Sequence, residues 1–246
     1  DHRDLHSFPT RRSSDLRNLE TQMAKERSEQ EAEIYRLRNV ELKKLNQEIE
    51  QKNEEITSSI EYARRIQDAM LPLDASIELY RDYAFILYQP RDIVSGDFYW
   101  IHSRPSPQDP SKKIIITAAV DCTGHGVPGA FMSMIGKDLL DNIIIAQGVI
   151  APQDILSQMD LGVRKALNQD QTDNQDGMDM AITVIDEANE CVYFAGANNP
   201  LLYFQHNQMQ YIKGSKCGIG GGKHLPDKLF EQHTIDRKST RLNSSH

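Results

Sequence analysis

The sequence predicts an α+β protein preceded by a long helix, and three observations support this prediction. Residues 17–70 are rich in Glu, Gln, Lys, Arg and Leu and contain no Gly or Pro, which favours one long helix. Short apolar segments that are typical of strands follow Pro72. These strands are grouped before and after a pair of helices, which favours packed antiparallel sheets with helices outside them over a doubly wound parallel sheet.

Local patterns place the elements of the globular part. The strand-like segments are short and rich in β-branched and aromatic residues between turn residues, whereas the first helical segment repeats large apolar residues at intervals of four. The expected strands are 84–89, 93–101, 113–120, 180–186, 191–195, 201–204, 209–212 and 230–235, and the expected helices are 128–147 and 152–168.

The second half of the long helix carries an apolar stripe with a seven-residue repeat. Because its polar flanks offer the stripe nothing to pack on, we expect a parallel dimeric coiled coil. Two of the four intervening d-type positions are polar, which makes the seam weak. The alternative is an amphipathic helix that packs on its own domain. The stripe consists of Leu42, Ile49, Ile56, Ala63 and Met70.

Composition excludes several classes of protein. The chain has 246 residues, 39% of them hydrophobic, and a formal net charge of −8, so a protein that binds the nucleic-acid backbone is not expected. No apolar run approaches the roughly 20 residues needed to span a bilayer, although a segment upstream could carry one. The three cysteines, Cys122, Cys191 and Cys217, lack metal-ligand spacing. We therefore expect a cytoplasmic location.

The two ends differ from the rest of the chain. Residues 1–16 and 237–246 share an Arg/Ser-rich composition without a helical or strand period, and we interpret them as non-native tails. The alternative is an ordinary disordered tail. Between them we expect a signalling helix or coiled coil over 17–71 and a globular domain over 72–236.

The most informative motif follows the apolar segment 114–120. Residues 121–130 read Asp-Cys-Thr-Gly-His-Gly-Val-Pro-Gly-Ala, so a buried strand ends in the carboxylate of Asp121, and a glycine-rich turn and a helix follow. A second carboxylate, Asp97, lies in the strand-like segment 95–100. Two strand-borne aspartates beside glycines indicate a site for Mg²⁺ or Mn²⁺, because these ions prefer oxygen ligands. The alternative for either aspartate alone is a hydrogen-bonded turn residue.

Together with three further motifs, these residues resemble a known family. The segments 129–136, 176–181 (Asp-Gly-Met-Asp-Met-Ala) and 195–200 (Ala-Gly-Ala-Asn-Asn-Pro) follow in the order typical of the SpoIIE/RsbU branch of the bacterial metal-dependent type 2C (PPM-type) serine/threonine protein phosphatases. The resemblance runs from about Ile60 to about Ile235. It implies an αββα sandwich of two antiparallel sheets flanked by helices, with a binuclear Mn²⁺ or Mg²⁺ centre at one end, between the sheets.

The resemblance also implies roles for individual residues. Asp121 is the ligand shared by both metal ions, the backbone carbonyl of Cys122 assists, and Asp97 belongs to the same centre. Asp179 either supports a ligand or binds a further metal ion. His125 is a candidate general acid for the leaving seryl oxygen, and the alternative is a turn histidine that caps the following helix.

Two further segments have a simpler interpretation. The thiol of Cys122 is expected to be a small core group rather than a nucleophile. Residues 218–222 contain four glycines but lack the Lys-Ser/Thr ending and the helix of a phosphate loop, so we expect a flexible loop on the substrate side.

The resemblance implies hydrolysis of phosphoserine or phosphothreonine on a phosphorylated STAS-type anti-sigma-factor antagonist, in partner-switching signalling. Family members continue past the strand 230–235 into a strand ending in Asp-Gly and later supply another metal-binding aspartate, and neither is present in these 246 residues. We therefore expect a phosphatase domain that is incomplete at its C-terminus and a chain that is inactive or nearly so by itself. The alternative is a catalytically incomplete interaction module that dimerises through the coiled coil.

Overall fold

The computed structural model describes residues 8–70, 85–222, 229–236 and 240–243. The chain divides into two compact units, Asp1–Ser58 and Ser59–His246, which are described separately. Within the described ranges, none of the helices combines the length and the hydrophobicity needed to cross a bilayer.

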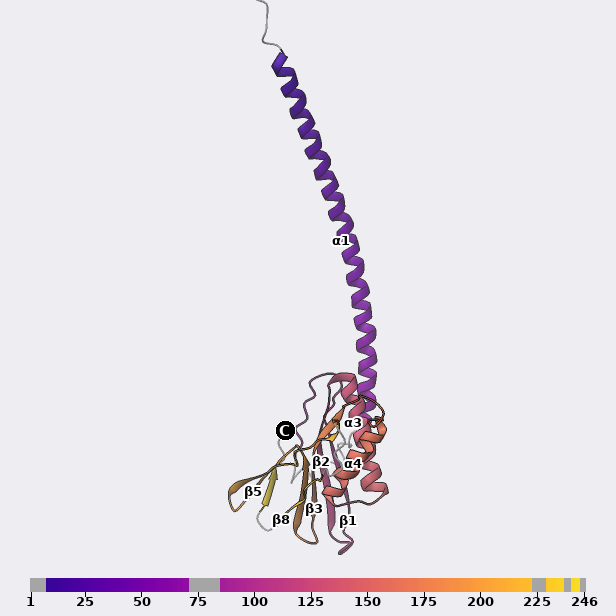
Figure 1. Cartoon of the computed structure of the whole chain (residues 1–246), viewed down its shortest axis with the longest axis vertical. Helices are drawn as coiled ribbons and strands as arrows, with labels where there is room; N and C mark the ends of the chain where they lie inside the picture. The colour runs from indigo at the N-terminus through magenta and orange to yellow at the C-terminus, as the bar shows by residue number, and fades with distance from the viewer. Residues whose placement is uncertain (1–7, 71–84, 223–228, 237–239, 244–246) are drawn as a thin grey trace, which may run out of the picture. The chain divides into compact units, whose positions relative to one another are not determined.

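The predicted long helix is present as α1 (Phe8–Met70), which is unbroken (Figure 1). It begins at Phe8, inside the segment 1–16 that the sequence analysis interprets as a non-native tail. In the first unit every residue whose side chain is described is exposed, and the stripe residues Leu42, Ile49 and Ile56 are more than half exposed. The apolar stripe of the first unit therefore has no partner within the described part of this chain.

The last turns of α1 belong to the second unit and behave differently. Gln67 is buried, and Ile60, Ala63 and Met70 are half-buried, whereas Ile66 at the predicted d-type position is exposed. Positions 60, 63, 67 and 70 form one face of a helix. This end of α1 therefore packs on its own domain, as the alternative for the stripe predicts.

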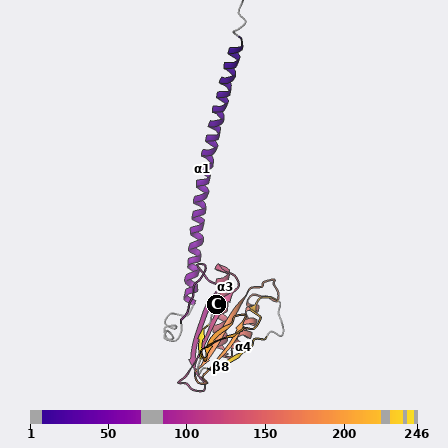
Figure 2. The same ribbon diagram turned by 90° about the vertical axis from the view of Figure 1, so that its left-hand side faces the viewer.

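Two antiparallel sheets form the centre of the second unit (Figures 1 and 2). The larger sheet has the order β1-β2-β3-β4-β8, and the short strand β7 pairs with β3; the smaller sheet has the order β6-β5-β9. The strands of the larger sheet are β1 (Phe98–Pro105), β2 (Lys113–Cys122), β3 (Gly177–Asp186), β4 (Cys191–Ala197), β7 (Ile219–Gly220) and β8 (His233–Asp236), and those of the smaller sheet are β5 (Leu201–Gln205), β6 (Gln208–Ile212) and β9 (Thr240–Asn243).

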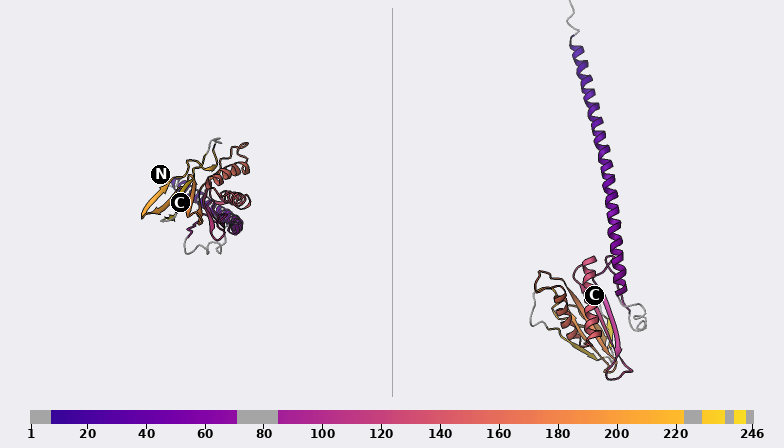
Figure 3. Two further views of the ribbon diagram at one scale, coloured as in Figure 1. Left: turned by 90° about the horizontal axis from the view of Figure 1, so that it is seen from below. Right: turned by 90° about the vertical axis from the view of Figure 1, so that its right-hand side faces the viewer.

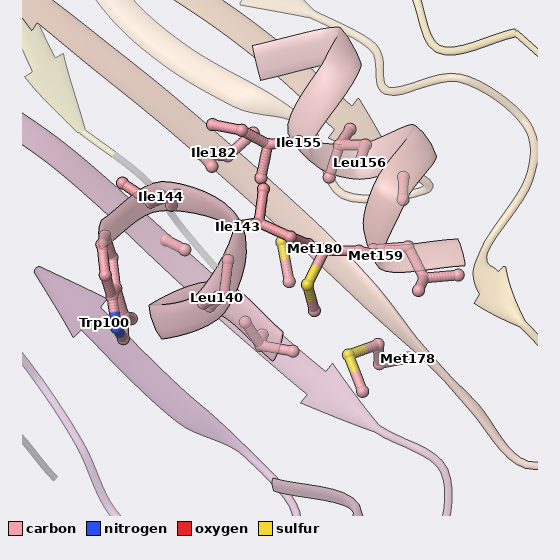
Figure 4. Close-up of a cluster of buried hydrophobic side chains, with 14 of the residues drawn as sticks. Trp100, Leu140, Ile143, Ile144, Ile155, Leu156, Met159, Met178, Met180 and Ile182 are labelled. Atoms are coloured by element: carbon pink, nitrogen blue, oxygen red, sulfur yellow. The ribbon is translucent and has the colours of Figure 1, made fainter. Parts of the chain in front are cut away.

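Helices cover one face of the larger sheet (Figure 3). They are α3 (Gly126–Leu140), which continues as the π-helix η1 (Asp141–Ala146), and α4 (Pro152–Ala166). The strands alternate buried and less buried residues, so one side of β2 faces these helices. Figure 4 shows the resulting core, in which side chains of α4, η1 and β3 interdigitate, among them Ile155, Leu156, Met159, Ile143, Met180 and Ile182.

The opposite face of the larger sheet carries a second core. It joins Ala181 of β3 and Phe194 of β4 to Leu201 of β5, and Ile212 of β6 packs against it. The smaller sheet therefore packs on the larger one, which gives a layer of helices followed by two sheets. This arrangement confirms the predicted mixed class of helices and antiparallel sheets.

Some boundaries differ from the expected ones for physical reasons. Residues 85–90 form no strand, and Phe85 and Leu87 are 83% and 77% exposed, so the strand predicted over 84–89 is wrong in its described part. β1 begins at Phe98 because the residues before it pack against a turn. The helix predicted over 128–147 begins at Gly126 and changes to π-helical geometry at Asp141. β9 lies inside the segment 237–246 that was interpreted as a tail.

Candidate metal centre

Two aspartates pair across neighbouring strands, and a third lies directly before the next strand of the sheet. Asp121 of β2 pairs directly with Asp179 of β3. Asp97 stands one residue before β1, whose pairing with β2 begins at Phe98 and Val120. Residues paired across antiparallel strands point to the same face of the sheet. That face is the one carrying Ala181, on which the smaller sheet packs, so the paired aspartates lie where the resemblance implies a metal centre.

A close backbone approach brings Asp97 next to the turn after β2. A Cβ atom on Gly96 would lie 2.8 Å from the carbonyl oxygen of Gly124 and 3.4 Å from that of Cys122, and one on Gly129 would lie 2.6 Å from the Gly124 oxygen. Only glycine fits contacts this short. The glycines therefore let the segment before β1 touch the β2–α3 turn, and they place the Cys122 carbonyl beside the residue that precedes Asp97.

The side chain of Cys122 is buried in the core between the sheet and the helices. Burial raises the pKa of its thiol far above the ordinary value, and the negative charges of Asp97 and Asp121 raise this pKa further. A thiol that stays protonated is a poor nucleophile. This supports the interpretation of Cys122 as a core group that offers the site only its backbone carbonyl.

A cavity of about 250 Å³ opens at this end of the sheet. Asp121, Cys122 and Asp179 line it together with glycines of the segment 218–221. Because glycines carry no side chains, this part of the lining leaves room in the cavity for a bulky group. The cavity thus combines carboxylate oxygens with a backbone lining that carries few side chains.

The available donors fit a hard cation. Within the ranges that the structure describes, no group of three or more His, Cys, Asp and Glu side chains could hold a metal ion, so a cation here would depend on fewer side chains together with carbonyl oxygens and water. Mg²⁺, in contrast, is commonly held by one or two carboxylates and keeps several waters. Asp97, Asp121 and the Cys122 carbonyl match that donor set, with exposed carboxylates that water can reach.

Asp179 is held by a hydrogen bond from its neighbour. Asn198 donates from Nδ2 to Asp179 Oδ1 at 2.8 Å, and Asn198 itself has φ of +58°, a conformation that asparagine tolerates in turns. A Cβ on Gly218 would lie 2.8 Å from the same carboxylate oxygen. One Asp179 oxygen is thus occupied within the protein, which suits a residue that supports the site from its edge.

His125 occupies the N-cap position of α3, but its side chain makes no capping hydrogen bond. Its Nδ1 instead lies 2.9 Å from Oδ2 of Asp92, and both side chains are exposed. A carboxylate on Nδ1 orients a histidine ring and selects its tautomer, which leaves Nε2 for a substrate. The sequence analysis did not identify Asp92, because the residue stands 33 positions upstream in a segment without regular structure.

The glycine-rich loop is fixed rather than flexible, which corrects the expectation for residues 218–222. Asp160 of α4 accepts a hydrogen bond from Gly220 N at 2.7 Å and pairs with Arg164 Nε at 3.1 Å. Arg164 also donates to the Gly221 carbonyl at 3.0 Å, and Gln169 accepts from Gly221 N at 3.1 Å. A buried ion pair on α4 therefore holds this part of the cavity lining in place.

This ion pair gives a prediction about stability. Arg164→Leu leaves the buried Asp160 carboxylate without its charged partner, and breaking a buried pair in this way costs about 3–5 kcal/mol. We expect the free energy of unfolding in urea to fall by that amount. Lys165→Leu, at the neighbouring exposed position, serves as the control and should change it little. Equal stability of the two variants would contradict the role assigned to the pair.

Comparisons with known proteins agree with the fold. The sequence profile of the family described as Stage II sporulation protein E (SpoIIE) matches residues 111–236, just over half of the chain. The chain is similar to the SiaA-PP2C domain of Pseudomonas aeruginosa, with 32% sequence identity and a TM-score of 0.59 over 75% of this chain and 68% of that chain. A comparison with curated protein sequences found no match.

Two further solved structures show lower similarity. One is the PP2C phosphatase domain of SpoIIE from Bacillus subtilis with a fragment of its regulatory domain, at 20% identity and a TM-score of 0.42 over 58% of this chain and 37% of that chain. The other is RsbX in complex with magnesium, at 17% identity and a TM-score of 0.42 over 61% of this chain and 65% of that chain.

The fold and the family match define the class as PP2C-type protein phosphatases, which are metal-dependent. Within this class, the chain belongs to the SpoIIE family of protein serine/threonine phosphatases.

Proposed function

We propose that the protein hydrolyses phosphoserine or phosphothreonine on a regulatory protein at a binuclear Mg²⁺ or Mn²⁺ centre. The observation that carries the proposal is the pairing of Asp121 with Asp179 at a cavity that these two aspartates and glycines of the segment 218–221 line, with Asp97 directly before the neighbouring strand β1. A structural turn aspartate needs neither carboxylate neighbours on the adjoining strands nor a cavity. Both features suit a phosphorylated side chain that approaches a cation site.

Each residue has a defined part in this proposal. Two bound divalent cations would supply a nucleophilic water at neutral pH and charge to bind phosphate oxygens. Asp121 and Asp97 would hold them, with the carbonyl of Cys122 assisting. His125, whose Nδ1 is oriented by Asp92, donates a proton to the leaving seryl oxygen. Asp179 is kept in place by Asn198 at the edge of the site.

The test is hydrolysis of a phosphoserine peptide in millimolar Mn²⁺ with and without a chelator. The resemblance implies further metal-binding aspartates that are not among these 246 residues. A longer form of the protein that carries them is therefore assayed beside the 246-residue chain. We expect chelator-sensitive turnover by the longer form and little by the 246-residue chain. Failure of the longer form to turn over would contradict the function, and robust turnover by the shorter one would show that those aspartates are dispensable.

The proposed substrate is a phosphorylated STAS-type anti-sigma-factor antagonist in the cytoplasm. This follows from the resemblance to the partner-switching branch, and the exposed residues Val127 and Pro128 near the site leave room for a protein substrate. A phosphorylated STAS domain should be hydrolysed faster than p-nitrophenyl phosphate at equal concentration.

A second candidate is a catalytically incomplete interaction module that dimerises through α1. It is favoured by the finding that, in the described part of the chain, no three potential ligand side chains form a metal-binding group. Mn²⁺ binding separates the two candidates, because an interaction module needs no metal.

A further inference from the structure

A side-chain amide joins two backbone segments that run along the cavity. Gln169 follows α4, and its Oε1 accepts a hydrogen bond from Gly221 N at 3.1 Å, while its Nε2 donates to the carbonyl of Asp176 at 2.6 Å. Gly221 belongs to the segment 218–221, which lines the cavity, and Asp176 belongs to the segment 175–179, of which the other residues line it. One amide therefore holds the two segments together.

The two segments approach each other more closely than side chains would allow. A Cβ atom on Gly177 would lie 2.4 Å from the carbonyl oxygen of Ile219, and one on Gly221 would lie 2.9 Å from the carbonyl oxygen of Gln175. Only glycine fits contacts this short. The spacing of the two segments is therefore set by direct backbone contacts, and the hydrogen bonds of Gln169 keep these contacts in place.

Backbone groups of two glycines in this lining are already hydrogen-bonded to side chains. Gly220 N donates to the buried Asp160 at 2.7 Å, and the Gly221 carbonyl accepts from Arg164 at 3.0 Å. A phosphate-binding loop holds its anion with backbone N–H groups, but here Asp160 and Gln169 occupy the N–H groups of both glycines. These two N–H groups are therefore not available to a phosphate, and this part of the lining can only contact the rest of a substrate.

We propose that Gln169 is a positioning residue that sets the width of the cavity between the segments 175–179 and 218–221, and that this width selects substrates by the peptide around the phosphorylated residue. The inference rests on the proposed function, because it concerns phosphopeptide hydrolysis. Gln169 does not line the cavity and acts through Gly221 and Asp176. A peptide places its backbone beside the glycines, whereas p-nitrophenyl phosphate has no backbone to place there.

The test compares three variants with the unaltered protein. They are Gln169→Met, which keeps the volume of the side chain without its polar atoms; Gln169→Glu, which keeps the acceptor for Gly221 N; and the control Gln171→Met at an exposed position nearby. Turnover of a phosphoserine peptide and of p-nitrophenyl phosphate is measured in millimolar Mn²⁺ on the longer form described above. Amide hydrogen exchange of Gly221 is followed on the 246-residue chain. If Gln169→Met does not fold, Gln169→Glu takes its place.

We expect Gln169→Met to raise KM for the phosphopeptide about tenfold, which is the effect of roughly one lost hydrogen bond. Its kcat, and its KM for p-nitrophenyl phosphate, should stay unchanged, because a misplaced lining weakens the binding of peptide in the ground state and in the transition state alike. Exchange at Gly221 should become faster. Gln169→Glu should have a smaller effect on KM, and Gln171→Met none.

The outcomes separate this proposal from the function on which it rests. A purely structural glutamine would lower kcat for both substrates through loss of folded enzyme and leave both KM values unchanged, and that result would overturn the proposal. An unchanged KM for the phosphopeptide in Gln169→Met would overturn it as well, while turnover by the unaltered longer form would still support the phosphatase. No turnover of the phosphopeptide by the unaltered longer form would overturn the proposed function and this inference together.

Discussion

Replacing Asp121 with Asn is expected to abolish hydrolysis of a phosphoserine peptide and to weaken Mn²⁺ binding about tenfold or more. Asp121 pairs with Asp179 and lines the cavity, so it is the carboxylate best placed to serve two ions. The substitution keeps the size of the side chain and removes its charge. If Asp121 is shared by both cations, as proposed, loss of its negative charge should weaken the attraction for both at once.

The companion variant Asp97→Asn should reduce turnover nearly as much, since it removes the carboxylate of the residue after Gly96, whose backbone lies close to the Cys122 carbonyl. Turnover is measured on the longer form of the protein described above, and Mn²⁺ binding on the 246-residue chain as well. Asp109→Asn, in the loop at the opposite end of β1 and β2, serves as the control and should behave like the unaltered protein. Unchanged turnover of Asp121→Asn or Asp97→Asn, with the fold intact by circular dichroism, would refute the assignment.

Much of the fold could be predicted from local pattern. β2 is an apolar run with a carboxylate at its end, and the turn after it carries the glycines that its geometry needs, including Gly124 with φ of +85°. The pairing of two aspartates, in contrast, depends on strand register. The sequence shows that Asp97 and Asp121 end strand-like segments, but only pairing shows that Asp179 lies directly opposite Asp121.

Where prediction failed, tertiary packing overrode the local signal. Residues 85–89 have apolar side chains suited to a strand, but they pair with no strand in the described part of the chain. Residues 93–97 were expected to extend β1, and the contact of Gly96 with Gly129 takes them out of the ladder instead. A glycine-rich segment such as 218–222 suggests mobility, and nothing local indicates the ion pair on α4 that holds it.

The buried polar residues were missed for a common reason. On a helix, Gln67 resembles any solvated glutamine, and Asp160 with Arg164 resembles an ordinary surface pair four residues apart. A signal was nevertheless present, because Gln67 falls on the face defined by Ile60, Ala63 and Met70. A polar residue on the buried face of a helix is a candidate for a fixed hydrogen-bond network.

The substitutions Ile49→Asp and Ile56→Asp, made together, are expected to convert a dimer into a monomer in light-scattering measurements. Both residues are more than half exposed in the single chain, and they repeat at the seven-residue spacing of a coiled-coil seam. Losing a buried Ile side chain costs roughly 2–5 kcal/mol, and a carboxylate placed in the seam adds its desolvation penalty. The polar residues Lys52 and Ser59 at d-type positions already weaken the seam, so this additional loss should be enough to dissociate the dimer.

The matched control places the same two carboxylates on the outward face, as Gln47→Asp with Gln51→Asp, and should remain dimeric. If pairing of α1 also regulates the phosphatase, the seam variant alone should change the turnover of the longer form, because the helix that carries the stripe ends in the turns that pack on the globular domain. A chain that is already monomeric at micromolar concentration, or a control that dissociates as readily as the seam variant, would show that the stripe of α1 is not a dimer interface. In that case any regulation through α1 would have to act on the helix of a single chain.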